Sequence, residues 1–296
     1  MGGVGAAGGG KAVEGGRDAG LALLPVVGER ALLFSPRGGP RTLVVGDLHL
    51  GIETDFARAG VKLPSAADAI VGRVEVLRAK TGARVLVIAG DLKHSVKGVT
   101  AQEGEEVPRA LGIWARSFAR VVWVPGNHDG AAPSLVPPGA RNVEVAHSGG
   151  YLCRGGLLVV HGHAWPDRAL AARAKGLVVA HNHCAVALED ALGRVAKEPC
   201  WARARVNPEK WREAGGGEGY PEVVLMPPFN ELCTGVAVNI EGARPIGPLL
   251  REGCVDLARA EIYLLDGVWL GKVEKNMIRP GAAEFQRLTR GISEDL

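Results

Sequence analysis

The sequence lacks features that would place it in several other classes of protein. It has no apolar run of about 18 residues or more, so we expect no helix that crosses a membrane. The start of the chain has no basic stretch followed by an apolar segment, so we expect no secretory signal peptide. The five cysteines form no Cys-x-x-Cys pair, and their odd number is typical of free thiols in a reducing cytoplasm.

The sequence also presents no side chain as a covalent nucleophile, because no serine or cysteine lies in a nucleophile-elbow or triad context. The stretch GAAGGGKA near the start resembles a phosphate-binding P-loop only superficially. Ala12 occupies the position of the required Ser or Thr, and no apolar strand precedes the stretch. We therefore expect no P-loop nucleotide site.

Charge and composition set broad limits on the fold and its partners. The formal net charge of +3 is too small to indicate nucleic-acid binding by itself, but it does not repel a phosphate substrate. The chain has 296 residues, of which 47% are hydrophobic, enough for one large α/β domain or two small ones. We expect a Gly- and Ala-rich flexible tail over residues 1–27, a main domain over 28–274, and a C-terminal tail or short helix over 275–296.

Short apolar runs alternate with helical patterns along the main domain. RALLFS and RTLVVG flank the turn sequence PRGG, which predicts a hairpin near the start. Ser65 is expected to cap an amphipathic helix whose apolar face includes Ile70. Asp266-Gly267 predicts a second hairpin over residues 260–274. Strands that alternate with helices predict a layered α/β fold.

Five of the apolar runs end on side chains that can bind metal ions. TLVVG is followed by Asp47 and His49, VLVIAG by Asp91, VVWVPG by Asn127 and His128, LLVV by His161 and His163, and LVVA by His181 and His183. Taken singly, such a residue is usually a turn residue. The carboxyl ends of strands in an α/β sheet gather at one edge, where ligands bind, so these five ends are expected to converge. Their mixture of nitrogen and oxygen donors favours Mn²⁺, Fe or Zn over Ca²⁺, and a carboxylate can bridge two ions.

The ordered set resembles the five motifs of the calcineurin-like metallophosphoesterases. The resemblance covers roughly residues 42–184 and is carried by Asp47-x-His49, Gly90-Asp91, Gly126-Asn127-His128-Asp129, His161 and His181-x-His183. GDLHLGIE, GDLKHS and PGNHDG are most similar to archaeal phosphoesterases related to SbcD-type repair nucleases, and bacterial phosphoesterases associated with DNA ligase are similar. The resemblance implies a layered αββα sandwich of two mixed β-sheets flanked by helices, with a dinuclear metal site at the strand ends.

The resemblance also implies a set of metal ligands. The first metal is held by Asp47, His49 and His183, the second by Asn127, His161 and His181, and both by Asp91. Two divalent ions are implied, with Mn²⁺ preferred and Fe, Zn, Ni or Mg as alternatives. His128 is expected to protonate or stabilise the leaving oxygen, and Asp129 to orient His128 through a hydrogen bond. The implied reaction is attack of metal-activated hydroxide on a phosphate ester.

Some residues leave alternatives open. Ala180 replaces the glycine that usually begins the last motif, which predicts a small backbone adjustment without loss of the metal. Asn182 contacts either substrate or solvent. His94 either touches the substrate phosphate or is a loop histidine bonded to backbone, and His163 lies either behind the site or on its substrate side. Near them, a solvated Lys93 and a packed Trp165 are expected.

The implied function is a phosphodiesterase or nuclease linked to DNA repair. A phosphomonoesterase or nucleotide phosphatase is the alternative, and a non-catalytic scaffold of the same fold is a third reading. The expected partners are a phosphate ester and, for a nuclease, DNA or nucleotides. One segment mixes basic residues with tryptophans, namely Trp201, Arg203, Arg205, Lys210, Trp211 and Arg212. Glu209 and Glu213 dilute its charge, so a solvated segment is favoured over a DNA groove.

Overall fold

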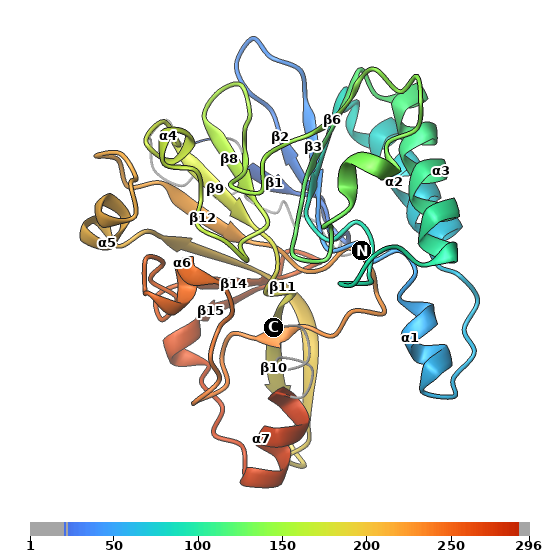
Figure 1. Cartoon of the computed structure of the whole chain (residues 1–296). Coiled ribbons are helices and arrows are strands. Elements are labelled where there is room, and N and C mark those ends of the chain that lie inside the picture. The colour runs from blue at the N-terminus through green and yellow to red at the C-terminus, as the bar shows by residue number, and fades with distance from the viewer. Residues whose placement is uncertain (1–20, 22, 290–296) are drawn as a thin grey trace, which may run out of the picture.

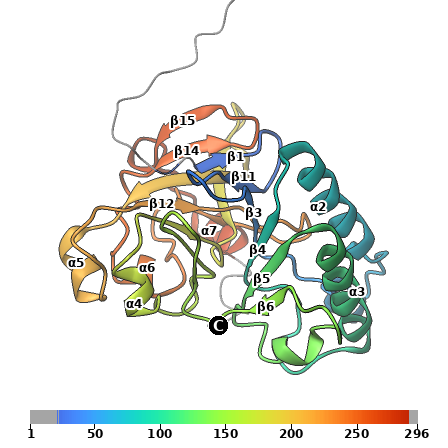
Figure 2. The same cartoon turned by 90° about the horizontal axis from the view of Figure 1, so that it is seen from above.

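The computed structural model describes residues 21 and 23–289, and two β-sheets lie face to face at its centre. Helices cover the outer side of each sheet, as Figure 1 and the view from above in Figure 2 show. Both sheets combine parallel and antiparallel neighbours. This layered sandwich of two mixed sheets flanked by helices confirms the α/β fold expected from the sequence.

The first sheet contains six strands whose spatial order follows the chain. They are β1 (Leu23–Pro25), β2 (Leu32–Phe34), β3 (Thr42–Val45), β4 (Val85–Ala89), β5 (Arg120–Val124) and β6 (Val143–Val145). β1 to β3 pair antiparallel, which includes the hairpin expected around PRGG, and β3 to β6 pair parallel. Parallel neighbours require crossover connections, which run through α1 (Glu53–Arg58), α2 (Ala67–Thr81) and α3 (Ala101–Ser117).

The side chains of β3 alternate between two apolar layers. Leu43 and Val45 pack with Val74 of α2 and Leu111 of α3 on the outer side of the sheet. Val44 points the other way, into the layer shared by the two sheets. Because β3 is buried on both faces, its sequence is a continuous apolar run without alternation.

The second sheet contains nine strands. Its path in space is β13 (Val236–Ala237), β10 (Cys184–Glu189), β11 (Val195–Arg205), β12 (Glu222–Leu225), β9 (Gly176–Val179), β8 (Leu157–Val160) and β7 (Tyr151–Leu152). β11 also pairs with β14 (Glu261–Leu264), which pairs antiparallel with β15 (Trp269–Lys272) in the segment where the second hairpin was expected. β8, β9 and β12 run parallel to one another, so their carboxyl ends share one edge.

Short helices cover the outer side of the second sheet. They are α4 (Arg168–Ala171), α5 (Pro208–Glu213) and α6 (Pro248–Arg251). Trp211 of α5 and Leu249 of α6 pack against Val179 and Leu225 of the sheet. α7 (Ala282–Thr289) lies beside β10, and single 3₁₀ turns occur at η1 (Ala132–Leu135) and η2 (Val273–Lys275). Among the helices of the described residues, none is long and apolar enough to cross a membrane.

Two expectations about local structure were wrong in detail. The tail predicted over residues 1–27 extends too far, because Leu23–Pro25 form β1 and bury Leu23 against the sheet. Residues 1–20 and 22 of that tail, and 290–296 at the other end, lie outside the described residues. Ser65 is not the N-cap of α2: that position is Ala66, and the Ser65 hydroxyl accepts a 3.1 Å hydrogen bond from the Ala67 N–H.

Candidate metal centre

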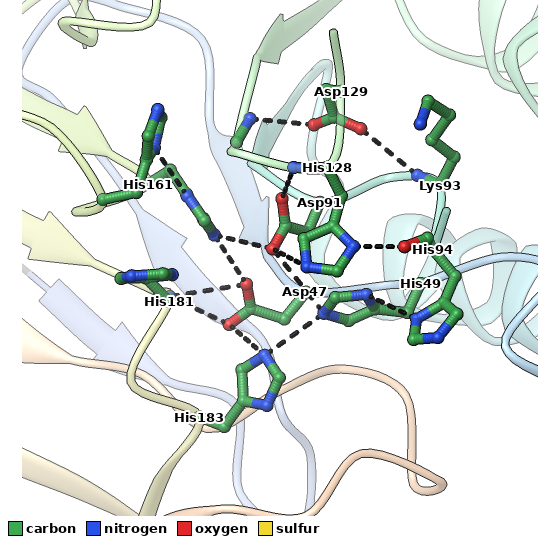
Figure 3. A network of polar contacts seen from close by, with 12 residues as sticks. Asp47, His49, Asp91, Lys93, His94, His128, Asp129, His161, His181 and His183 are labelled. Atoms are coloured by element: carbon green, nitrogen blue, oxygen red, sulfur yellow. Dashed lines mark hydrogen bonds and ion pairs between the residues drawn. The ribbon is translucent and has the colours of Figure 1, made fainter. Parts of the chain in front are cut away.

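The carboxyl ends of strands from both sheets meet at one place (Figure 3). β3, β4 and β5 end beside one another in the first sheet, and β8 and β9 end beside one another in the second. Glycines in the turns permit very close approach. A Cβ on Gly90 would lie 2.2 Å from Cδ2 of His161, and a Cβ on Gly126 would lie 2.1 Å from Oδ1 of Asp91. The two sheets therefore bring their polar strand ends into one cluster.

Residues at these turns adopt a backbone conformation that L-amino acids rarely use. Within the described residues, the non-glycine positions with positive φ are Asp47, His49, Asp91, His181 and His183, with φ between 43° and 64°. This left-handed region costs a non-glycine residue about 1–2 kcal/mol. Such strained positions concentrate at functional sites, where surrounding contacts hold them. The strain supports a functional role for this set.

A first group of metal donors consists of Asp47, His49 and Asp91. All three side chains are buried, and their ligand atoms lie within 4.8 Å of one another. Nε2 of His49 is 3.7 Å from Oδ2 of Asp91. His183 adds a nitrogen to this side of the cluster, because its Nε2 lies 3.2 Å from Nε2 of His49 and 3.8 Å from Oδ2 of Asp47.

A second group of donors consists of Asp91, His161 and His181, again within 4.8 Å of one another. Nε2 of His161 lies 3.2 Å from Oδ1 of Asp47 and 3.2 Å from Oδ2 of Asp91. Asn127 lies in the loop after β5, with Pro125 and Gly126 between it and the last residue of that strand, Val124. The backbone N–H of the next residue, His128, donates to Oδ1 of Asp91 at 3.0 Å. Asp91 therefore belongs to both groups and lies between them.

The electrostatics of the cluster suit divalent cations. Burial opposes ionisation of Asp91, but the imidazoles of His161, His49 and His128 outweigh it and hold its pKa well below the usual range. Burial likewise opposes protonation of His161, but Asp91 and Asp47 raise its pKa to about 10. Buried carboxylates of this kind need positive charge nearby, and metal cations supply it.

Two further imidazoles of the cluster, His49 and His181, are in the neutral form that binds metals. Burial lowers the pKa of His49 well below its ordinary value, and burial together with His161 lowers the pKa of His181 to about 2. Both rings are therefore neutral and offer a lone pair. Nδ1 of His183 lies 3.2 Å from the Thr234 carbonyl oxygen, so Nδ1 donates there and Nε2 stays available. The donor set fits two divalent ions.

Comparison with known proteins assigns the family. The model of the calcineurin-like phosphoesterases matches residues 40–211, which is more than half of the chain. The chain belongs to the calcineurin-like phosphoesterase family. Among solved structures, it is similar to the nuclease MPE of Pseudomonas putida, with 19% identity, a TM-score of 0.46 and coverage of 82% of this chain and 97% of that one. It is also similar to the E. coli phosphoesterase YfcE, with 17% identity, a TM-score of 0.36 and coverage of 78% and 97%. No curated protein matches.

As a calcineurin-like phosphoesterase, the protein is a metal-dependent hydrolase of phosphate esters, and the structure shows how further residues support the site. Nδ1 of His128 faces the carbonyl oxygen of His94. The His94 ring lies 3.2 Å from Nδ1 of His49 and 3.0 Å from Oδ2 of Asp55. His94 thus positions two other histidines of the site, a role that its place in the sequence did not indicate. A contact between His94 and the substrate phosphate stays a prediction.

The role expected for Asp129 in this phosphoesterase was wrong. Its carboxylate accepts hydrogen bonds from the backbone N–H groups of Leu92, Lys93 and Gly126 and from the Trp123 indole, while the His128 ring is held by a backbone carbonyl. Burial and the nearby Asp91 raise the pKa of Asp129 to about 6. Asp129 therefore fastens the loop after β4 to the loop after β5, and it acts on the His128 ring only through that loop.

Three neighbours of the phosphoesterase site also differ from expectation. Asn182 does not face solvent, because its buried amide exchanges two 3.0 Å hydrogen bonds with the backbone of Ile246, and a contact with substrate stays a prediction. Lys93 is fully buried, and its ammonium donates to the Ser95 carbonyl oxygen. Trp165 is 43% exposed, so it is not packed in the core. His163 contacts His161, with their Nδ1 atoms 2.9 Å apart, and both of its expected positions, behind the site and on its substrate side, stay predictions.

The basic segment runs along β11 away from the candidate metal centre. Arg203 pairs with Glu222, the first residue of β12, which is aligned with the first residue of β9. The candidate ligands His181 and His183 instead follow the last residue of β9. Trp201 and Trp211 are each 1% exposed and cannot stack on bases. Arg205 is aligned with Glu222, so the segment from Arg205 onward leaves the sheet at the amino ends of β12 and β9, away from the phosphoesterase site.

Proposed function

We propose that this phosphoesterase is a dinuclear metal enzyme that hydrolyses phosphodiesters, acting as a phosphodiesterase or nuclease linked to DNA repair. The observation that carries the proposal is the position of Asp91, whose carboxylate belongs to both groups of metal donors. A carboxylate shared in this way is what two ions about 3.5–4 Å apart require. The resemblance of GDLHLGIE, GDLKHS and PGNHDG to the SbcD-related subgroup supports the choice of diesters and of DNA.

The proposed ligands divide between two ions. The first ion would be held by Asp47, His49 and His183, and the second by Asn127, His161 and His181. Asp91, which belongs to both groups of donors, would be shared between them. Mn²⁺ is proposed for this mixture of carboxylate, amide and imidazole donors, with Fe, Zn, Ni or Mg as alternatives. When bound, the two ions supply Lewis-acid activation of water and of the phosphoryl oxygens.

His128 is proposed to deliver a proton to the leaving oxygen. The carbonyl of His94 holds Nδ1 of the His128 ring, which fixes that nitrogen as the donor and leaves Nε2 as the site of proton exchange. Nε2 lies 3.9 Å from Oδ2 of Asp91, so it faces the space above the bridging carboxylate. A proton held at Nε2 is therefore directed to the place where a phosphate ester would lie.

A panel of substrates with Mn²⁺ tests the proposal. We expect hydrolysis of bis-nitrophenyl phosphate and of single- or double-stranded DNA, with slower hydrolysis of mononitrophenyl phosphate. Activity on the monoester alone would replace the proposal with the phosphomonoesterase or nucleotide phosphatase. Lack of activity with Mn²⁺, Fe²⁺, Zn²⁺, Ni²⁺ and Mg²⁺ would favour the non-catalytic scaffold. A cytoplasmic location is also proposed, because the four buried cysteines, Cys153, Cys184, Cys200 and Cys254, form no disulfide.

A further inference from the structure

The loop of residues 228–235 connects β12 to β13 and is attached to the strand end that carries the first metal ligands. The backbone N–H of Asn230 donates to the Asp47 carbonyl at 3.3 Å, and its side-chain amide donates to the Leu48 carbonyl at 2.9 Å. Asn230 is itself buried. Hydrogen bonds to both residues hold this loop against the turn after β3.

The far end of the 228–235 loop is attached to His183. The Thr234 carbonyl accepts from Nδ1 of the His183 ring at 3.2 Å, and the Val236 N–H donates to the His183 carbonyl at 3.1 Å. A Cβ on Gly235 would lie 2.4 Å from the same carbonyl oxygen, so glycine is needed for this approach. The loop therefore spans from the turn with Asp47 to the turn with His183.

Cys233 lies between these two attachments. Its backbone N–H donates to the Asn230 carbonyl at 3.2 Å. Its sulfur and one ring nitrogen each of His49 and His183 all lie within 4.8 Å of one another. Because zinc bonds are about 2.3 Å to sulfur and 2.0–2.1 Å to nitrogen, the ligand atoms on one ion lie within roughly 4.5 Å of one another. Small rotations of the half-buried Cys233 side chain suffice to reach an ion held by the two histidines.

We propose that Cys233 is a thiolate ligand of the first metal ion and gives that position a preference for softer cations. The proposal rests on the dinuclear centre proposed above. When the sulfur–metal bond forms, the thiol proton leaves to water. Thiolate selects Zn²⁺, Fe²⁺ or Co²⁺ over Mn²⁺, whereas the second position has only oxygen and imidazole donors. The two positions therefore differ in the metal they hold best.

Cobalt reports on sulfur ligation directly. The full chain, stripped of metal and reconstituted with Co²⁺, is expected to show visible ligand-field bands and a near-ultraviolet sulfur-to-cobalt charge-transfer band. In Cys233→Ser the charge-transfer band disappears while the visible bands persist. Cys254→Ser is the matched control, because Cys254 is buried beside the carbonyl of Lys210 in the cluster under α5 and α6, and it retains the band.

Metal competition provides a second readout. Cys233→Ser is expected to lower the affinity for Zn²⁺ by at least ~10-fold and to change the affinity for Mn²⁺ much less, because the lost ligand is soft. The role of Cys233 would be overturned if the parent protein showed visible bands but no charge-transfer band. It would also be overturned if the charge-transfer band survived in Cys233→Ser. Either result would leave the metal centre intact. Absence of all Co²⁺ bands would instead overturn the metal centre, and this proposal with it.

Discussion

At the scale of single residues, the left-handed backbone of the metal-donor positions is held by hydrogen bonds between neighbouring turns. The Asp47 N–H donates to the Gly90 carbonyl at 3.2 Å, and the His49 N–H donates to the Asp91 carbonyl at 2.8 Å. Each turn thus stabilises the strained conformation of the other. The ligand atoms of Asp47, His49 and Asp91 lie within 4.8 Å of one another, and the hydrogen bonds between the turns hold them there.

Asp91→Asn is the sharpest test of the bridging position. The amide keeps the shape of the side chain but loses the charge that both donor groups share. We expect metal affinity to fall by at least ~100-fold, because second-shell substitutions alone cost 10–100-fold. Phosphodiesterase activity should be lost with it. Metal content measured by elemental analysis, together with turnover, checks the prediction; retention of full metal content and activity would show that Asp91 does not bridge.

His128→Ala should separate metal binding from chemistry. The backbone N–H of residue 128, which donates to Asp91, is unchanged by the substitution, so the ligands keep their arrangement. We expect metal content equal to that of the parent and a decrease in kcat of about 10²–10⁴-fold, the usual contribution of a general acid. The same elemental analysis and kinetics apply. A loss of metal in this variant would show that His128 is a ligand.

At the scale of elements, the glycines between strand and ligand decide how closely the two sheets approach. Gly90 has a φ of +81°, and a Cβ there would meet the ring of His161, which comes from the other sheet. Gly60 has a similar φ of +84°, but a Cβ there would meet no atom within 4 Å. Alanine at Gly60 would add backbone strain alone, whereas alanine at Gly90 would add both backbone strain and steric overlap. Comparison of the two positions therefore separates these costs.

Gly90→Ala and Gly60→Ala are therefore matched variants. Gly60→Ala should lower the free energy of unfolding by about 1–2 kcal/mol, the cost of a left-handed alanine. Gly90→Ala should lower it by about 1–3 kcal/mol more, because the methyl group displaces the His161 ring, and it should also weaken metal binding. Urea unfolding and metal content measure both effects. Equal destabilisation of the two variants with unchanged metal content would contradict the close-approach argument.

Element by element, the sequence predicted best what depends on residues close together in the chain. Each donor lies within four residues after the end of a strand, so its place could be predicted from local pattern alone. The distant partners of Asp129 and Asn182 could not, because they come from other loops: Leu92 lies 37 positions before Asp129, and Ile246 lies 64 positions after Asn182. β1 was missed because three residues beside a Gly-rich tail carry too little pattern to indicate a strand.

At the scale of the whole molecule, one apolar layer joins the two sheets. Val44 and Val122 of the first sheet meet Val159 and Val178 of the second, and Cys153 lies in the same layer. The sequence predicted the strands that supply these residues, but not which faces would meet, since both sheets contain strands that are apolar on both sides. The metal centre lies where this layer reaches the strand ends, so its geometry depends on how the sheets dock.

The Cys153 thiol reports on that docking through its ionisation. Burial between the sheets raises the pKa of Cys153 from 9.0 to about 12. Above pH 9 the unfolded chain therefore releases the Cys153 proton, whereas the folded chain retains it. The contribution of Cys153 to the free energy of unfolding is unchanged below pH 9, and it falls as the pH rises towards 12. This single group contributes a slope of about 1.4 kcal/mol per pH unit at most.

Cys153→Ala removes this contribution while its small side chain leaves the layer otherwise intact. The free energy of unfolding of the parent, measured in urea between pH 8 and pH 11, should fall more steeply with pH than that of Cys153→Ala. The expected difference in slope approaches about 1.4 kcal/mol per pH unit near the upper end of the range. Other buried groups, including Cys200, titrate equally in both proteins and cancel in the comparison. Parallel curves would show that Cys153 reaches solvent and that the two sheets are less closely docked around it.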